Sequence, residues 1–182
     1  MNDTINSIMN RYSCRSFTAR TPSNGDLQII AKAAIASPSG MNRQPWQVIV
    51  VKNRELICEM DDEVLRVMKS MPDKSLYERI VSHRGRPFYN ASCMVIVAIE
   101  PGTSFDCGIL SENIVLAATS LGINSLICGV AGFAFEEDKG AKFKEKLELP
   151  DGYEIGIAIL LGYAAEQGEP HEPDLRKIKF IV

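Results

Sequence analysis

Four short apolar runs predict the strands of a buried sheet. Each is rich in β-branched or aliphatic residues and is flanked by polar or turn-forming residues. The runs are residues 46–51 (WQVIVV), 92–100 (SCMVIVAIE), 124–130 (NSLICGV) and 153–163 (YEIGIAILLGY). A fifth segment, KIKFIV at residues 177–182, alternates apolar and polar positions and predicts a last, exposed strand.

Helical periodicity predicts helices between these runs. Apolar residues there recur at three- and four-residue spacing, which places them on one face of a helix. The strongest helical segment, residues 106–123, is apolar on several sides, and we expect it to be central. The predicted helices are residues 3–10, 24–37, 53–71, 106–123 and 136–149.

Residues that favour helix ends mark the limits of these helices. Pro38 disfavours helical geometry at Ser37, and Gly122 suits the position just after a helix. Residues 72–90 are polar and mixed, with at most a short helix around 77–81. Short polar side chains accept hydrogen bonds from the free N–H groups of a first turn. The expected N-caps are Asp3, Ser23 or Asn24, and Asn53.

The alternation of helices and strands indicates a layered α/β or α+β domain. A length of 182 residues and a hydrophobic fraction of 46% suit one domain with a real core. We therefore expect residues 1–182 to form a single domain, with residues 168–182 as a C-terminal arm that ends in the exposed strand.

Charge and cysteine content exclude several classes of protein. The net charge of −3 argues against a general binder of nucleic acid or acidic membrane, because both need a basic surface. No apolar run reaches the ~18–20 residues that span a membrane. The five cysteines form no CxxC pair and no signal peptide is visible, so we expect reduced thiols in a cytoplasmic protein.

The sequence contains no strong side-chain catalyst. It lacks GxGxxG after a strand, GxxxxGK[ST], GxSxG and HExxH, so no phosphate loop, nucleophile elbow or zinc protease site is indicated. The two histidines, His83 and His171, lie far apart, and no metal site is expected. The acidic pair Asp61–Asp62 is interpreted as solvated charge on a helix. The absence of a side-chain catalyst leaves three classes open: a cofactor enzyme, a binding protein and a structural protein.

The stretch RYSCRSF, at residues 11–17, carries two arginines four residues apart. If it is extended, Arg11, Ser13 and Arg15 share one side, and the two arginines are roughly 13 Å apart. That separation suits the two ends of a nucleotide-like ligand. If it is helical, the two like charges are neighbours and mildly destabilising unless an anion lies between them. An ordinary charged helix end is the competing interpretation.

The stretch SPSGMNRQPW, at residues 37–46, is a turn-rich loop that leads into the first strand. Ser39 and Asn42 can form hydrogen bonds there, and Gly40 leaves room for a ligand to approach the backbone. An ordinary structural loop is the alternative. Trp46 is expected in the core rather than as a surface on which a ligand stacks.

Together these stretches resemble the nitroreductase family of FMN-dependent oxidoreductases. RYSCRSF is similar to the family's R-x-S-x-R/K-x-F box, and SPSGMNRQPW is similar to its P-S-x-x-N-x-Q-P-W loop. SENIVLAATSLGINSLICGVAGF resembles the central helix, the following strand and a glycine turn. The resemblance covers nearly the whole chain. It implies an α+β (α/β/α layered) nitroreductase-like fold, with a mixed, mostly antiparallel sheet and a C-terminal strand exchanged with a dimer partner.

The resemblance also implies how the first box would hold FMN. Arg11 would bind the phosphate, and Ser13 would donate a hydrogen bond to the phosphate or ribityl chain, with the Tyr12 backbone nearby. Arg15 would reach the N1–C2=O edge of the flavin, where negative charge collects on reduction. Cys14 would then face away from the cofactor.

Other FMN contacts would come from distant segments and from a partner. By the resemblance, Cys128, Gly129 and Val130 would lie near flavin N5. Lys177 and Arg176 would close on the phosphate. The loop that begins at Pro38 would line the FMN bound by the partner subunit. Its contact residues would be Pro38, Ser39, Gly40 and Asn42.

The implied activity is a ping-pong oxidoreductase. NAD(P)H would give hydride to flavin N5, and an electron-poor acceptor such as a nitroaromatic or quinone would then be reduced. The flavin carries the chemistry, so no catalytic side chain is required. The alternatives are a specialised flavin dehydrogenase, a flavin-cleaving member of the superfamily, and a non-enzymatic flavin-binding redox module.

Overall fold

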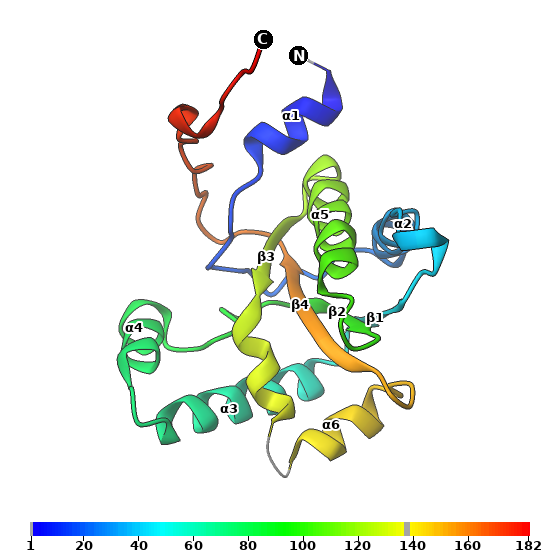
Figure 1. Ribbon diagram of the computed structural model, residues 1–182. Coiled ribbons are helices and arrows are strands. Elements are labelled where there is room, and N and C mark those ends of the chain that lie inside the picture. The colour runs from blue at the N-terminus through cyan, green and yellow to red at the C-terminus, as the bar shows by residue number, and fades with distance from the viewer. Residues whose placement is uncertain (1, 137–138) are drawn as a thin grey trace.

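The computed structural model describes residues 2–136 and 139–182, except the side chains of residues 83 and 84. Figure 1 shows the helices arranged around a twisted sheet. The α-helices are α1 (Asp3–Asn10), α2 (Asn24–Ile35), α3 (Arg54–Ser70), α4 (Ser75–Arg84), α5 (Ser104–Ser120) and α6 (Lys139–Lys146). The strands are β1 (Trp46–Val51), β2 (Cys93–Ile99), β3 (Asn124–Cys128) and β4 (Glu154–Gly162).

The four strands form one sheet in the order β1-β2-β4-β3. All three pairings between strands are antiparallel, with Val48 of β1 opposite Val97 of β2 and Val95 of β2 opposite Ile159 of β4. Among the described residues, an isolated parallel bridge joins Ser13 and Ser125 outside the named strands. The predicted α+β fold with a mostly antiparallel sheet is therefore confirmed.

Helices cover both faces of the sheet, which confirms the predicted three layers. All seven residues of β2 are buried, because its alternate side chains enter two different cores. Val95 and Val97 pack in the core on the side of α2 and α5. Met94 and Ile96 pack in the core on the side of α3. Trp46 is 9% exposed and belongs to the α2–α5 core, as the sequence predicted.

Polar side chains cap the N-terminal ends of α1, α2 and α3. The side chain of Ser23 accepts from the N–H of Asp26, and that of Asn53 accepts from Leu56, so these two predicted N-caps are confirmed. The cap of α1 is Asn2 rather than Asp3. Helix α5 ends just before Gly122, whose φ of +69° is a conformation that glycine adopts readily.

Three predicted elements differ in the structure. Residues 129–135, of which the sequence assigned the first two to a strand, form a 3₁₀ helix instead. The predicted helix 136–149 is shortened to α6, and its residues 137–138 lie outside the described part of the chain. The segment 72–90, which had no readable pattern, contains α4, which is longer than the short helix predicted around 77–81.

The C-terminal arm does not form the predicted strand within one chain. Residues 169–182 are all exposed, and Leu175–Lys177 form a 3₁₀ turn. A strand needs a neighbouring sheet edge to satisfy its backbone groups, and this arm lies beside α1, away from the sheet (Figure 1). Among the described residues no helix is long and apolar enough to cross a membrane.

Candidate functional site

The segment of residues 11–17 is extended and lies against the end of the sheet. It leaves α1 at Arg11, whose ψ of 133° is no longer helical. The N–H of Cys14 donates to the carbonyl of Ser125 on β3 at 2.9 Å. The N–H of Ala165 donates to the carbonyl of Ser16 at 2.9 Å. The extended alternative for RYSCRSF is therefore confirmed, and the helical one is wrong.

Side chains alternate along this segment as an extended backbone requires. Cys14 is 1% exposed, and its thiol donates to the carbonyl of Ser16 at 3.3 Å. Arg15 is exposed on the opposite side. Tyr12 departs from the pattern, because it borders cavities on the same side as Ser13 while its hydroxyl accepts from Asn124 at 3.0 Å.

Three cavities adjoin along the exposed side of this segment. The Arg11 cavity, of about 260 Å³, includes Arg11, Tyr12, Asn124, Ser125 and Gln167. The central cavity, of about 460 Å³, includes Tyr12, Ser13, Arg15, Arg79, Tyr89 and Gln167. The Cys128 cavity, of about 190 Å³, includes Arg15, Arg79, Ile80, Tyr89 and residues 128–130. Shared lining residues connect each cavity to the next, so the three form one trough.

The Arg11 end of the trough contains an unsatisfied polar atom. The hydroxyl of Ser125 is buried and has no hydrogen-bond partner in the described part of the chain. Such groups usually have a partner, because an unpaired buried hydroxyl costs about 1–3 kcal/mol. A cation and a hydroxyl at the wall of one cavity suit an oxygen-rich anion.

The Cys128 end of the trough is mostly apolar. Its lining consists of two arginines, Tyr89 and otherwise mostly apolar residues, among them residues 126–130. Cys128 itself is 4% exposed, and burial raises the pKa of its thiol to about 12. The thiol is therefore uncharged near neutral pH, and this end of the trough has no nucleophilic thiolate.

Tyr89 forms part of two cavities from a strained loop. Tyr89 and Asn90 have φ values of 51° and 61°, in the left-handed region that larger side chains seldom adopt. The guanidinium of Arg54 donates to the carbonyl of Asn90 at 3.1 Å. The N–H of Phe17 donates to the carbonyl of Tyr89 at 3.3 Å. These contacts hold the loop in a conformation that it would not otherwise favour.

Asp61 anchors the same loop from below, so its interpretation as solvated charge is wrong. It is 4% exposed and accepts hydrogen bonds from the N–H of Phe88 at 2.9 Å and the guanidinium of Arg86 at 2.6 Å. Burial raises the pKa of this carboxyl, and the bond to Arg86 opposes that shift. Asp62 is more exposed, and it pairs with the other side of Arg86.

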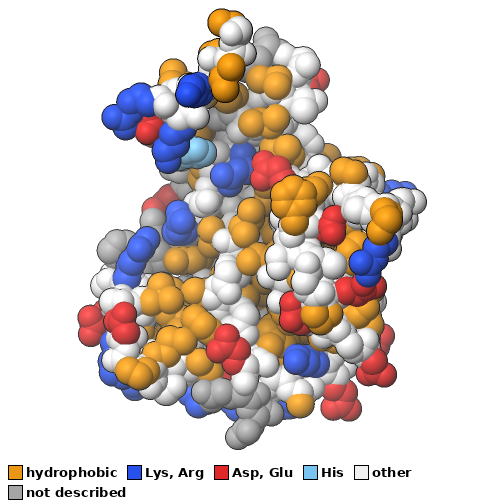
Figure 2. Space-filling view, in the orientation of Figure 1, with side chains coloured by type: hydrophobic (Ala, Val, Ile, Leu, Met, Phe, Trp, Pro, Cys, Tyr) orange, Lys and Arg blue, Asp and Glu red, His pale blue; other side chains and the backbone are white. Residues whose placement is uncertain are grey.

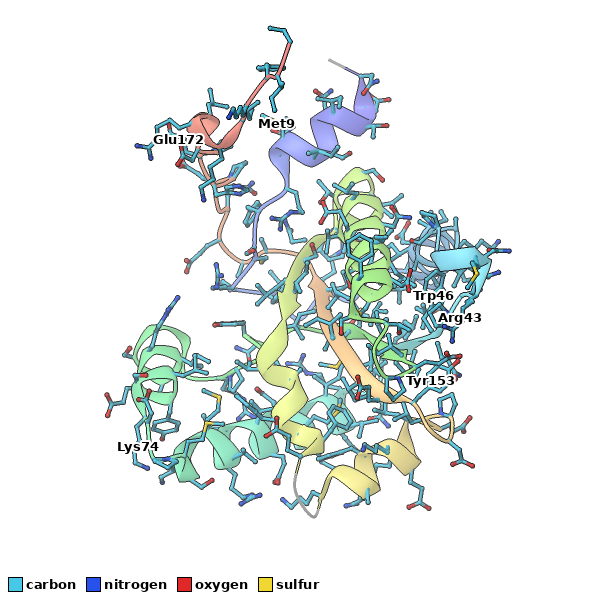
Figure 3. All side chains as sticks on the ribbon, viewed as in Figure 1. Met9, Arg43, Trp46, Lys74, Tyr153 and Glu172 are labelled. Atoms are coloured by element: carbon cyan, nitrogen blue, oxygen red, sulfur yellow. The ribbon has the colours of Figure 1, made fainter. Side chains whose placement is uncertain are left out.

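The loop of residues 38–42 does not reach the trough in the same chain. The N–H of Gly40 donates to the carboxylate of Asp106 at 3.2 Å, and the N–H of Gln44 donates to Ser39 at 2.9 Å. In Figure 3 the neighbouring Arg43 and Trp46 lie on the right of the molecule, while α4 lies on the left. None of the four expected contact residues, Pro38, Ser39, Gly40 and Asn42, borders any of the three cavities.

The two basic residues of the arm also lie outside the trough. The guanidinium of Arg176 pairs with Asp174 at 2.7 Å, and Lys177 is exposed on the same turn. In Figure 3 Glu172, from the same arm, lies at the top of the molecule near Met9 of α1. Within one chain neither Arg176 nor Lys177 borders any of the three cavities.

Sequence reasoning missed several residues of the trough. Arg79, Ile80 and Tyr89 come from the segment that had no readable pattern, and nothing in their spacing points to Arg15. Asp61 did leave a signal, because it shares the apolar face of α3 with Ile57. Among the described residues no group of three His, Cys, Asp or Glu side chains could hold a metal ion.

Comparison with known sequences identifies one family. The profile described as "Nitroreductase family" matches residues 8–163. A protein of Archaeoglobus fulgidus, named provisionally as an NADH dehydrogenase/NAD(P)H nitroreductase, is 30% identical over 97% of this chain and 94% of its own length. A protein of the same name from Methanothermobacter thermautotrophicus is 29% identical over 90% of this chain and 78% of its own.

Solved structures agree with the sequence comparison. A nitroreductase with bound FMN from Desulfitobacterium hafniense is 49% identical and superposes with a TM-score of 0.98 over all of both chains. A nitroreductase with bound FMN from Bacteroides fragilis is 27% identical, with a TM-score of 0.91 over all of both chains.

Proposed function

The chain belongs to the nitroreductase family, and on that premise we propose that it is an FMN-dependent oxidoreductase that uses NAD(P)H. The observation that carries this proposal is the trough, because its polar and apolar ends suit the two ends of FMN. Bound in the trough, FMN would accept hydride from NAD(P)H and then reduce an electron-poor acceptor such as a nitroaromatic or quinone.

The Arg11 end suits the phosphate of FMN. A phosphate monoester carries about −1.5 to −2 charge near neutral pH, and Arg can bind it through two parallel hydrogen bonds. The unpartnered hydroxyl of Ser125 offers a further hydrogen bond in the same cavity. Ser13, between the two arginines, would donate to the phosphate or ribityl chain.

The ring of the flavin fits the other end of the trough. Arg15 borders both the central and the Cys128 cavities, so its guanidinium would lie at the ring edge that becomes negative on reduction. Residues 128–130 would present backbone to the N5 side. The raised pKa of Cys128 keeps a second negative charge away from this end.

A homodimer would complete the site. The loop 38–42 borders none of the three cavities of its own chain, so we propose that it contacts the FMN of a partner subunit. Residues 1–182 would act as one domain whose arm, residues 168–182, pairs with the partner. Strand β1 is an unpaired edge of the sheet, and the apolar residues 178–182 could add to such an edge. Lys177 and Arg176 would then approach a phosphate.

The thiols bear on the cellular compartment. None of the five cysteines forms a disulfide bond in the structure, and four of them are buried. Free thiols are usual where the surroundings are reducing, so we propose a cytoplasmic location.

Anaerobic reduction of the purified protein tests the activity. We expect a yellow protein whose visible flavin band is bleached by NADH or NADPH and restored by para-nitrobenzoate or a quinone. Excess FMN added to protein that has lost its cofactor should raise the melting temperature, since a ligand of the native state stabilises it. A colourless protein with no shift on adding FMN would refute the proposal.

The alternatives give different results in the same experiment. A yellow protein that neither nicotinamide cofactor bleaches is a flavin-binding module and not an NAD(P)H oxidoreductase. Bleaching followed by the loss of flavin under air, with new products, would instead identify a flavin-cleaving member of the superfamily. Analysis of the products formed with and without an added acceptor distinguishes a specialised flavin dehydrogenase from these two alternatives.

A further inference from the structure

Two arginines from different elements border the same two cavities. Arg15 comes from the extended segment after α1, and Arg79 comes from α4. Both border the central cavity and the Cys128 cavity. In the part of the chain that the structure describes, neither guanidinium forms an ion pair. Arg15 donates only to the carbonyl of Ser13, at 3.4 Å.

The surroundings of this pair favour a negative, largely apolar ligand. Glu166 borders the central cavity, but the described lining of the Cys128 cavity includes no acidic residue. Leu76, Ile80 and Val130 supply apolar contacts there. Two like charges at one cavity repel each other and produce a positive potential that an anion would relieve. In Figure 2 basic side chains lie along the left side, where the surface is indented below the C-terminal arm.

FMN does not account for both arginines. This inference rests on the function proposed above, in which Arg11 binds the FMN phosphate and Arg15 lies at the edge of the flavin ring. FMN then offers no further negative group with which Arg79 could pair. Arg79 belongs to α4, borders the central cavity and is exposed, so an incoming molecule could reach it.

We infer that Arg79 forms an anion subsite for the acceptor and that the enzyme prefers aromatic acceptors with a carboxylate. The aromatic part would lie against the open face of the flavin ring, beside the aliphatic side chains of α4, and the carboxylate would pair with the guanidinium.

The test compares two acceptors that differ in charge. Para-nitrobenzoate and its neutral methyl ester are reduced by FMN-loaded wild-type enzyme and by Arg79→Gln, and kcat/KM is measured for each. We expect the variant to lose about fivefold with the carboxylate, as an exposed charge pair would give, and to change less than about twofold with the ester. The loss should shrink as salt rises, since exposed charges are screened.

Lys74→Gln is the matched control. Lys74 is a cation at the start of the same helix, but it borders none of the three cavities and lies at the edge of the molecule in Figure 3. We expect both acceptors to be reduced by this variant as by wild type.

Other outcomes would overturn the inference without touching the proposed function. An equal loss of kcat/KM with both acceptors, or no loss with either, would show that Arg79 does not bind the carboxylate. Loss of bound FMN in Arg79→Gln would assign the residue to the cofactor. Slower bleaching by NAD(P)H, with acceptor rates unchanged, would assign it to the phosphates of the hydride donor. A wild-type protein that binds no FMN would instead refute the proposed function itself.

Discussion

Burial decides which cysteines can react. Cys58 is exposed, and the other four thiols are buried. Burial also raises the pKa of Cys93 and Cys128 to about 12, so their reactive thiolate forms are scarce at ordinary pH. Cys14 stood out in the sequence because it lies between two arginines, but in the structure it is a core residue.

One thiol should therefore react quickly in the native protein. Addition of a thiol reagent near pH 8 should label about one group per chain, and Cys58→Ser should remove that fast phase. Denaturant should then expose the remaining cysteines. Fast labelling of more than one group in the native wild-type protein would show that the burial of these side chains is wrong.

Asp61 shows what single-residue reasoning can and cannot foresee. It lies on the apolar face of α3 with Ile57 and Val64, so its burial was readable from periodicity. Its partner was not, because Arg86 is 25 residues away and approaches only through the fold. The ion pair of Asp61 and Arg86 helps to hold the loop of Tyr89, which borders the trough. No local sequence pattern predicts such a pair of distant residues.

Among the elements, α3 connects the loop of Tyr89 on one side with α6 on the other. Glu63 is 1% exposed and pairs with Lys139 of α6 at 2.9 Å. It also accepts from Arg66, and that hydrogen bond is the largest cause of its lowered pKa, about 2. A carboxylate whose pKa is lowered by folding stabilises the native state while it is ionised.

Glu63→Gln should weaken the α3–α6 contact in a pH-dependent way. Near pH 7 we expect the free energy of unfolding to fall by roughly 1–2 kcal/mol. The difference from wild type should shrink as pH falls through the ordinary carboxyl pKa toward about 2, because the wild-type carboxylate is then protonated. Urea unfolding at several pH values measures it.

Glu59→Gln is the control for this prediction. Glu59 also pairs with α6, through Lys146, but it is far more exposed than Glu63. Its replacement should change the stability much less at any pH. A difference for Glu63→Gln that stays constant down to pH 2 would contradict the assigned role of the carboxylate.

The sequence predicted best those helices and strands whose own residues show both the type of element and its ends. Strand β2 is apolar throughout, and α5 ends at a glycine, so both were placed within a few residues. The KIKFIV strand is not formed within one chain, because alternation shows a preference for strand but not the edge with which the strand pairs. Residues 129–135 are apolar too, yet they bend into a 3₁₀ helix where β3 ends.

For the whole molecule, the arm is the feature that most favours the proposed homodimer. Leu175 is 70% exposed, Phe180 85% and Ile181 87%, although each is a large apolar side chain. Several such side chains close together usually mark a contact surface. The Arg11 end of the trough and the loop 38–42 also lie on different parts of one chain, so one chain alone leaves the proposed site incomplete.

Removal of residues 168–182 should therefore cost dimerisation and FMN together. Light scattering of the shortened protein should give the mass of a single chain, and its flavin-to-protein ratio should fall well below that of wild type. A shortened protein that stays a dimer with full flavin would contradict the exchange of the arm.

The flavin-to-protein ratio of two variants tests the central claim that RYSCRSF is the clamp for FMN. Arg11→Ala removes the cation from the phosphate end, and Cys14→Ser changes a side chain on the buried face of the same segment. Loss of a charge-assisted hydrogen bond of about 1.5–3 kcal/mol should weaken FMN binding about 10- to 100-fold. The visible absorbance of each purified protein should show little flavin in Arg11→Ala and the wild-type ratio in Cys14→Ser. Full flavin in Arg11→Ala, with flavin lost from Cys14→Ser, would contradict the account.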